Sequence, residues 1–132
     1  MKMKRPHPVP LSRQAMEIIE ALRPLTGRAP LLFPNVRRAH EPISDNTLSR
    51  YVNRSGHQGA HVPHGWRSSF STIMNELHHN EKDRAVIDLM LAHLPKNAIE
   101  AAYNRAAYMP RRREIAQQWA DMLMDGMEPA SA

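Results

Sequence analysis

Residues 64–93 read HGWRSSFSTIMNELHHNEKDRAVIDLMLAH, and this stretch decides the fold. Apolar side chains recur every three or four residues in two runs, which is the spacing of one face of a helix. The positions on these faces are Trp66, Phe70, Ile73, Met74, Leu77, Val86, Ile87, Met90 and Leu91. We therefore predict one helix from Trp66 to about His78 and a second from Glu81 to His93.

The residues before this stretch predict an extended segment, a helix and a connector. Three alternating prolines exclude a helix over Lys4–Leu11 and allow only an edge strand. Ser12 is the expected N-cap of a helix that ends at Pro24. Its apolar face is predicted to be Ala15, Met16, Ile18, Ile19 and Leu22. Leu31–Pro34 is expected to be a short buried connector.

A second early helix is predicted between residues 44 and 53. Ser44 is its expected N-cap, and the helix is expected to end near Asn53. Its inward-facing residues are predicted to be Leu48, Tyr51 and Val52. Glycine and proline mark residues 55–63 as a loop.

Two more helices are predicted after residue 93. A short one spans about 97–105, and Pro110 suits the first turn of another that ends near residue 126. The apolar stripe of this last helix is Ile115, Trp119, Met122 and Leu123. Residues 127–132 are expected to be a disordered tail. The predicted fold class is mainly α, with about five to six helices and at most a short edge strand or hairpin remnant.

The charge of the chain favours a polyanionic partner. The 132 residues carry a formal net charge of +5 and give a pI of about 10.1. The surplus lies in residues 1–54, which hold ten Lys/Arg against four Asp/Glu. Such a surface attracts phosphate groups by electrostatic steering. A solvated basic face without a partner explains the charge equally well.

Composition also excludes several classes of protein. The chain has no cysteine, so it contains neither disulfides nor thiolate metal sites. No apolar run approaches the roughly 20 residues that span a bilayer. The basic N-terminus lacks the apolar segment of a signal peptide. We therefore expect a soluble, cytoplasmic protein.

Four polar side chains can together break a phosphodiester without a metal: His64, Arg67, His93 and Tyr103. Arginine grips phosphate oxygens with a planar fork, tyrosine can act as a covalent nucleophile, and histidine moves protons near neutral pH. Taken singly, each of these residues has an ordinary structural explanation. Tyr108 is a second candidate for the nucleophile. Their joint order is specific, because Leu-Ala-His follows the H-x-x-R motif by about 26 residues and the tyrosine follows ten residues later.

These motifs resemble those of the tyrosine recombinases, most closely the prophage integrases. The matching segments are His64-Gly65-Trp66-Arg67, Leu91-Ala92-His93, Ala101-Ala102-Tyr103-Asn104-Arg105-Ala106 and the tail from Tyr108 to Leu123. Lys2–Leu11 is similar to the lysine-bearing β-turn and following strand of the family. The resemblance covers nearly the whole chain. It implies the C-terminal portion of an integrase catalytic domain over residues 1–126, largely helical with a small sheet at one edge.

The resemblance also implies site-specific recombination of double-stranded DNA at attachment sites. Tyr103 would attack the scissile phosphate, form a 3′-phosphotyrosyl bond and release a 5′-hydroxyl. Arg67 would hold the non-bridging oxygens, and Lys2 would protonate the leaving oxygen. His64 and His93 would act on the proton of the nucleophile or bond the phosphate. Neither a metal nor another cofactor is implied, and the protein would be cytoplasmic and associated with the bacterial nucleoid.

The chain departs from the family pattern in several places. Trp66 stands where phenylalanine is more frequent, and the interval from His93 to Tyr103 is one residue longer than in many recombinases. Val62-Pro63 replaces small residues before the first motif, so we expect a different loop there. The largest departure is that no residue can be assigned to the upstream arginine of the phosphate clamp. We therefore expect a truncated integrase (a gene remnant, an internal-start product or an excised piece) that is inactive alone.

Other functions compete with this interpretation. A non-catalytic module could bind the DNA backbone through Lys4, Arg5, Arg37, Arg38, Arg50 and Arg54. The C-terminal helix 110–124 could support self-association, or it could fold back onto its own domain. A metal site built from three nearby histidines, His57, His61 and His64, is not expected. Intervening glycine and proline break any helix that would align them, and no carboxylate or cysteine completes the set.

Overall fold

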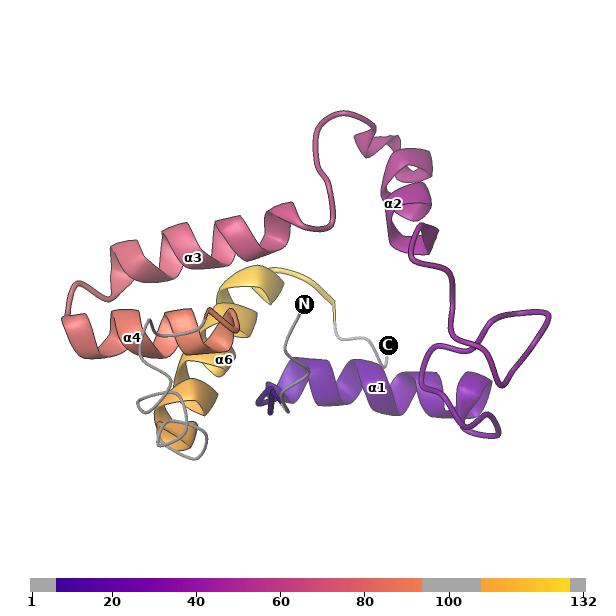
Figure 1. Cartoon of the computed structure of the whole chain (residues 1–132), viewed down its shortest axis with the longest axis horizontal. Coiled ribbons are helices and arrows are strands. Elements are labelled where there is room, and N and C mark those ends of the chain that lie inside the picture. Colours follow the sequence, from indigo (N-terminus) through magenta and orange to yellow (C-terminus); the bar gives the residue numbers. More distant parts are fainter. Residues whose placement is uncertain (1–6, 94–107, 129–132) are drawn as a thin grey trace.

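The computed structural model describes residues 7–93 and 108–128. Within these ranges the only β pairing is one isolated antiparallel bridge between Pro34 and Pro42. The helical elements are, in chain order, α1 (Arg13–Thr26), α2 (Thr47–Val52), the π-helical turn η1 (Asn53–His57), α3 (Gly65–Leu77), α4 (Glu81–Met90) and α6 (Met109–Met124) (Figure 1). The predicted mainly α fold class is confirmed.

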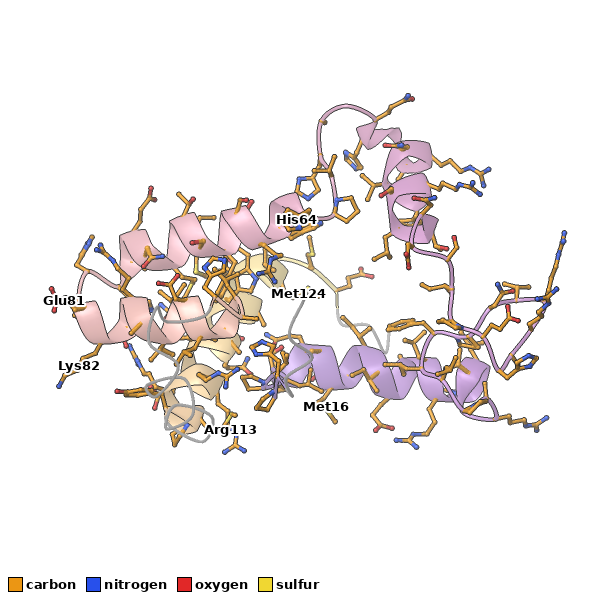
Figure 2. All side chains as sticks on the ribbon, in the orientation of Figure 1. Met16, His64, Glu81, Lys82, Arg113 and Met124 are labelled. Atoms are coloured by element: carbon orange, nitrogen blue, oxygen red, sulfur yellow. The ribbon has the colours of Figure 1, made fainter. Side chains whose placement is uncertain are left out.

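Helices α3 and α4 form an antiparallel hairpin. They run side by side in opposite directions in Figure 1, and residues 78–80 join them. His64 lies at one end of this hairpin, whereas Glu81 and Lys82 lie at the other (Figure 2). The first turn of α3 therefore lies beside the last turn of α4, although these segments are distant in sequence.

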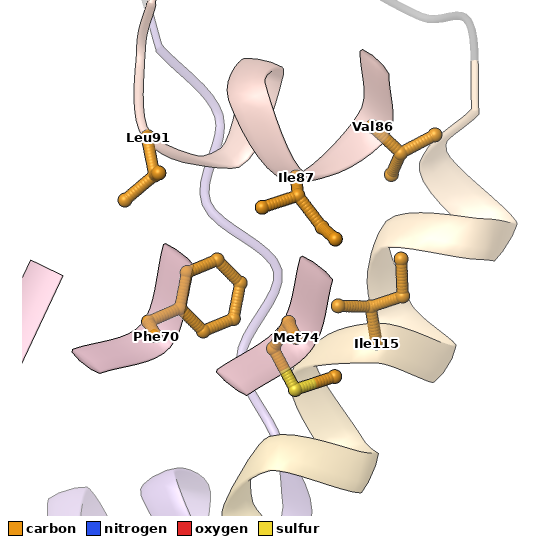
Figure 3. Packing of buried hydrophobic residues seen from close by; sticks show 6 residues of the cluster. All are labelled: Phe70, Met74, Val86, Ile87, Leu91 and Ile115. Atoms are coloured by element: carbon orange, nitrogen blue, oxygen red, sulfur yellow. The ribbon is translucent and has the colours of Figure 1, made fainter. Parts of the chain in front are cut away.

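The core lies where α3, α4 and α6 meet (Figure 3). Its buried side chains are Phe70, Met74, Val86, Ile87, Leu91 and Ile115. Trp119 of α6 covers the edge of the cluster, with its ring T-shaped against Phe70 at a centroid separation of 5.5 Å. The predicted apolar faces thus meet in one cluster. Their outer members, Trp66, Leu77, Met122 and Leu123, remain exposed.

An ion pair attaches α6 to the start of α4. The side chain of Asn80 caps α4 by accepting a hydrogen bond of 2.8 Å from the Asp83 amide. The buried Asp83 carboxylate accepts two hydrogen bonds of 2.7 Å from Arg111. Asn80 Nδ2 also donates to Asp83 Oδ2 at 2.7 Å, and the bonds from Arg111 and Asn80 hold the pKa of Asp83 well below its usual range. The first turn of α6 is thereby bonded to the capping turn of α4.

Helix α4 ends at Met90, three residues before the predicted end at His93. Ala92 adopts a left-handed conformation with φ of 54°. Its amide donates to the Leu89 carbonyl at 3.0 Å, and the His93 amide donates to the Asp88 carbonyl at 2.9 Å. Together these bonds form a Schellman motif, which satisfies the last carbonyls of a helix. Glycine usually marks such an ending, and an alanine gave no such signal in the sequence.

Helix α1 begins where predicted and ends slightly later. The Ser12 hydroxyl accepts a hydrogen bond of 3.2 Å from the Ala15 amide, which confirms the N-cap. The helix then continues past Pro24 to Thr26. A proline removes one intrahelical hydrogen bond, and in the last turn little helix remains to be disrupted.

The packing of α1 follows the predicted apolar face only in part: Ala15, Ile19 and Leu22 are half-buried, but the one buried residue of the helix is polar. Its buried residue is Gln14, whose Nε2 donates to Asp121 Oδ1 at 2.5 Å. Gln117 Nε2 donates in turn to Gln14 Oε1 at 2.8 Å. Met16 and Ile18, by contrast, are each 43% exposed. A polar seam therefore joins α1 to α6, and hydrogen bonds to Gln14 and Gln117 lower the pKa of Asp121.

The segment of residues 27–63, which we call the arm, is more exposed than predicted. Leu32 and Phe33 are 42% and 52% exposed, so the connector at Leu31–Pro34 is not buried. Helix α2 starts at Thr47, and its predicted inward residues Leu48 and Tyr51 are 58% and 71% exposed. Among the helical elements given above, α2 packs only against η1. Of its three predicted inward residues, only Val52 is half-buried.

The predicted N-terminal strand is not formed in the part that the structure describes. Residues 7–12 have no regular secondary structure, and residues 4–6 lie outside the described ranges. The Pro8 carbonyl accepts a hydrogen bond of 2.5 Å from Arg112 Nη2 instead of pairing with a strand. Arg112 is buried, and this desolvation lowers its pKa. The predicted short helix at 97–105 also lies outside the described residues, as do residues 129–132 of the expected tail.

Candidate active site

A polar pocket opens between the start of α3 and the turn that follows α4. Its lining residues are His64, Arg67, Ser68, Ser71, Thr72, Leu91 and His93. Three of the predicted site residues, His64, Arg67 and His93, therefore share one pocket. The antiparallel hairpin brings them together, because α3 begins beside the end of α4 (Figures 1 and 2). The cavity volume of about 260 Å³ lies below the roughly 300–1,000 Å³ of sites for larger ligands.

Arg67 links the two sides of this pocket. It lies in the first turn of α3, and its Nη2 donates a hydrogen bond to the Leu91 carbonyl at the end of α4. A guanidinium has five N–H donors in a fixed plane. One N–H group therefore orients the guanidinium. The exposed side chain retains further N–H groups that can donate hydrogen bonds to a phosphate.

The backbone amides at the start of α3 are not available to bind an anion. The amides of Gly65, Trp66 and Arg67 donate to the carbonyls of residues 62–64, at 2.8, 3.4 and 3.2 Å. Amides bonded in this way are not free donors for an anion. Side chains, rather than these amides, therefore carry the anion-binding capacity of this corner.

His93 follows the Schellman turn and is held by Asp88. Its Nδ1 lies 3.2 Å from Asp88 Oδ1, and both side chains are more than half exposed, at 58% and 52%. The sequence predicted His93 as the last helical residue, close to the helix dipole. It instead lies beyond the C-cap residue Leu91, and its position depends on the turn.

His64 occupies the N-cap position of α3 without a capping hydrogen bond from its side chain. The preceding loop is fixed by His61, whose ring lies T-shaped against Trp66 at 4.7 Å between centroids. A Cβ atom on Gly65 would lie 3.0 Å from His61 Cε1, so this position has little room for a side chain. Glycine at the second position of the motif therefore allows the loop to pack closely.

The three loop histidines do not form a metal site. Within residues 7–93 and 108–128, no group of three His, Cys, Asp or Glu side chains is placed to hold a metal ion. His61 packs against Trp66, as described above, while His64 lines the pocket.

The remaining predicted site residues are divided between the arm and the undescribed segments. The predicted nucleophile Tyr103, the predicted acid Lys2, and Lys4 and Arg5 lie outside the described residues. The arm carries the other predicted backbone-binding residues, which are all exposed: Arg37, Arg38, Arg50 and Arg54. None of these four lines the pocket. Arg38 is paired with Glu41 at 3.0 Å.

Two sets of residues in or beside the pocket were not singled out in the sequence. The hydroxyls of Ser68, Ser71 and Thr72 line the pocket from α3. Counted from His64, Arg67 and these three residues stand at i+3, i+4, i+7 and i+8, which is the spacing of one helix face and could have indicated them. Asp88 contacts His93 only because of the turn after α4, and no local motif indicated that turn.

Comparison with known proteins agrees with the motifs. The model of the Phage integrase family matches residues 1–109. The chain is 40% identical over 123 residues to Prophage integrase IntA and 39% identical over 123 residues to Prophage integrase IntZ, both of Escherichia coli (strain K12). It is 35% identical over 124 residues to the Integrase of Shigella phage Sf6. The chain belongs to the phage integrase family of tyrosine recombinases.

These matches cover most of this chain but a minor part of each relative. They span 93% of this chain in all three cases, and 29%, 30% and 31% of IntA, IntZ and the Sf6 integrase. The chain thus spans about three tenths of the length of these relatives. No solved structure matches the chain significantly. No helix among the described residues is long and apolar enough to cross a membrane.

Proposed function

We propose that this chain supplies part of the active site of an integrase that cuts and rejoins double-stranded DNA at attachment sites. The observation that carries the proposal is the pocket shared by His64, Arg67 and His93. A phosphate placed there would meet a fixed guanidinium and two imidazoles, which are the groups that phosphoryl transfer needs for charge stabilisation and proton movement. Family membership supports the same reaction.

In the proposed reaction the hydroxyl oxygen of Tyr103 attacks the scissile phosphorus. A bond forms between this oxygen and phosphorus, and the bond to the 5′-oxygen breaks, which leaves a 3′-phosphotyrosyl linkage. Lys2 gives a proton to the departing 5′-oxygen, and Arg67 stabilises the negative charge on the non-bridging oxygens. His64 or His93 receives the tyrosine proton or bonds the phosphate. Attack by a 5′-hydroxyl of the partner strand reverses these steps and joins the new strand.

We further propose that these 132 residues do not cleave DNA alone. The resemblance calls for an additional arginine on the phosphate, and no residue of the printed sequence matches it. Loss of one donor to a transition state commonly lowers the rate by about 10²–10³-fold. The chain is therefore expected to act only together with residues that complete the clamp.

A chimera tests the proposed reaction. These residues would replace the matching 123-residue stretch of Prophage integrase IntA, and the product would be mixed with a nicked attachment-site duplex that traps the covalent intermediate. We expect a protein–DNA adduct that survives denaturing electrophoresis. Tyr103→Phe should abolish the adduct, because it removes the attacking oxygen. Tyr108→Phe is the matched control and should retain it.

The opposite assignment would contradict the proposal. If Tyr103→Phe forms the adduct and Tyr108→Phe does not, the nucleophile is Tyr108. If the chimera binds DNA with salt sensitivity but forms no adduct, the second candidate function is favoured. That function is non-catalytic binding to the DNA backbone, and the exposed arginines of the arm are the observation that favours it.

Self-association through α6 remains a prediction. In this chain Ile115 of α6 is buried and Trp119 packs on the same core, so half of the apolar stripe is already used. Met122 and Leu123 are 44% and 38% exposed and would have to carry any contact with another copy.

A further inference from the structure

We propose that Asp88 is a positioning residue that selects which ring nitrogen of His93 faces the pocket. The catalytic use of the His93 ring rests on the proposed function, whereas the contact between Asp88 and His93 does not depend on that function. Two contacts carry it. The Asp88 carbonyl accepts the His93 amide at 2.9 Å, and Asp88 Oδ1 lies 3.2 Å from His93 Nδ1.

The first contact comes from the Schellman motif at the end of α4. In this motif the carbonyl of the third-last helical residue accepts the amide of the second residue after the C-cap, and their side chains meet. Here those residues are Asp88 and His93. An apolar contact usually joins the two positions. A carboxylate and an imidazole replace it in this chain.

The second contact determines the tautomer of the ring. An ionised carboxylate only accepts hydrogen bonds, so the Nδ1 of His93 must carry the proton that is shared with Asp88. In the neutral ring Nε2 is then unprotonated, and it is the only ring nitrogen left to act in the pocket. An unprotonated Nε2 can receive a proton from a hydroxyl, whereas the opposite tautomer would present Nδ1 for that purpose.

Asp88 has no evident role in the stability of α4 itself. It lies in the last turn of the helix, where the negative end of the dipole disfavours a carboxylate. Its side chain is 52% exposed, so it does not fill the core. Within the described residues, His93 is the only group that bonds its carboxylate. The contact with His93 therefore accounts for an acidic residue at a position that otherwise favours a base or alanine.

Nuclear magnetic resonance of the full 132-residue chain tests this inference without any DNA. Long-range proton–nitrogen correlation spectra distinguish protonated from unprotonated ring nitrogens, and His93→Gln identifies the signals of His93. At a pH where the ring is neutral, we expect wild-type His93 to be mainly protonated on Nδ1. In Asp88→Ala it should be mainly protonated on Nε2, the form that free histidine prefers.

Two controls separate positioning from folding. Asp125→Ala removes an exposed carboxylate after α6 and should leave the His93 tautomer unchanged. Asp88→Ala should melt at the same temperature as the wild type or higher, because alanine suits the last helical turn better. If wild-type His93 is mainly protonated on Nε2, or if Asp88→Ala leaves its tautomer unchanged, the inference is wrong.

The IntA chimera then tests the use of the ring. Asp88→Ala should slow adduct formation on the order of 10- to 100-fold, the range seen when the partner that orients a metal-bound histidine is removed. Asp88→Glu should recover part of this rate, and DNA affinity should be unchanged in both variants. A wild-type chimera that forms no adduct would overturn the proposed function, whereas the tautomer measurement would still support or overturn the role of Asp88. Equal adduct rates in the wild type and Asp88→Ala would overturn the catalytic use of the positioned ring.

Discussion

Asp83 is the residue whose charge the helix cluster depends on most directly. Asp83 is 6% exposed, and its carboxylate accepts hydrogen bonds from both Arg111 and Asn80. An ionised group in such a place is stabilised only while its partners remain. Because its pKa is lowered in the folded state, folding favours the ionised form of Asp83.

We therefore predict a pH-dependent cost for Asp83→Asn. At neutral pH the free energy of unfolding should fall by about 2 kcal/mol, since a charge-assisted pair is lost. The contribution is present above the unfolded pKa of about 3.9 and declines as the pH falls below it towards the folded pKa. In urea unfolding the difference between wild type and variant should accordingly be nearly constant down to about pH 4 and clearly smaller at about pH 2.

The control for this prediction is Asp125→Asn, which alters an exposed carboxylate. It should change stability little at either pH. A difference for Asp83→Asn that stays constant, or grows, as the pH is lowered would show that the ion pair with Arg111 does not stabilise the fold.

At this scale the sequence indicated part of the candidate site. His64, Arg67 and His93 could be selected because their order is specific, and the structure places them in one pocket. Asp88 could not be selected, since its contact with His93 depends on a left-handed alanine that no local signal announced. Arg111 was likewise one member of an arginine run, and only the packing of α6 shows that it pairs with Asp83.

Among the elements, the turn that ends α4 holds one of the two non-glycine residues of the described chain that adopt a left-handed conformation; the other is Tyr108, before α6. Ala92 is held at φ of 54°, where a Cβ atom clashes with the following carbonyl. The turn nevertheless places the Leu91 carbonyl against Arg67 and the His93 side chain in the pocket. Local strain is thus accepted at the point where the two sides of the candidate site meet.

We predict that Ala92→Gly stabilises the chain. Glycine adopts this conformation without the steric cost of roughly 1–2 kcal/mol, although it loses more backbone entropy on folding. A net gain of about 0.5–1 kcal/mol is expected, measured by thermal or urea unfolding. The matched control is Ala85→Gly, an exposed position within the same helix, which should lose about 1 kcal/mol. Two changes of the same sign would contradict the left-handed assignment.

Helical spacing predicted the elements best where apolar faces pack against one another. The ranges expected for α3 and α4 agree with the structure to within a few residues, because Phe70, Met74 and Ile87 all reach the core. Spacing was right only in part for α1 and α2, where Ile19 and Val52, for example, are half-buried. Gln14 is buried while Met16 is not, and Leu48 faces solvent, because tertiary contacts and not periodicity decide which face is covered.

For the whole molecule, the main contrast is between the packed helices and the arm. The exposed cations Arg37, Arg38, Arg50 and Arg54 all lie on the arm. In Figure 1 α2 lies apart from the hairpin of α3 and α4. Bound DNA that reaches both regions would place backbone contacts on the arm and the scissile phosphate at the pocket.

Salt dependence of DNA binding tests this arrangement. For Arg50→Ala/Arg54→Ala, the slope of log affinity against log salt should become shallower by up to about 1.8, because each lost phosphate contact removes about 0.9. The matched control is Lys82→Ala/Arg84→Ala, which removes the same charge from exposed positions at the start of α4. Lys82 lies at the opposite end of the hairpin from His64 (Figure 2). Fluorescence anisotropy with a labelled duplex gives both slopes. Equal slopes for the two double variants would show that only net charge matters.

The polar seam between α1 and α6 indicates which helix separates first when the protein partly unfolds. Gln14, Gln117 and Asp121 join these helices through amide and carboxylate hydrogen bonds. Water forms hydrogen bonds with such groups nearly as well as protein does. These bonds therefore orient the two helices more than they stabilise the contact between them. The first helix should accordingly detach while the Phe70–Ile115 cluster is still intact. Deuterium would then enter the α1 amides well before those of α3 and α4, and the protein would open from its N-terminal side.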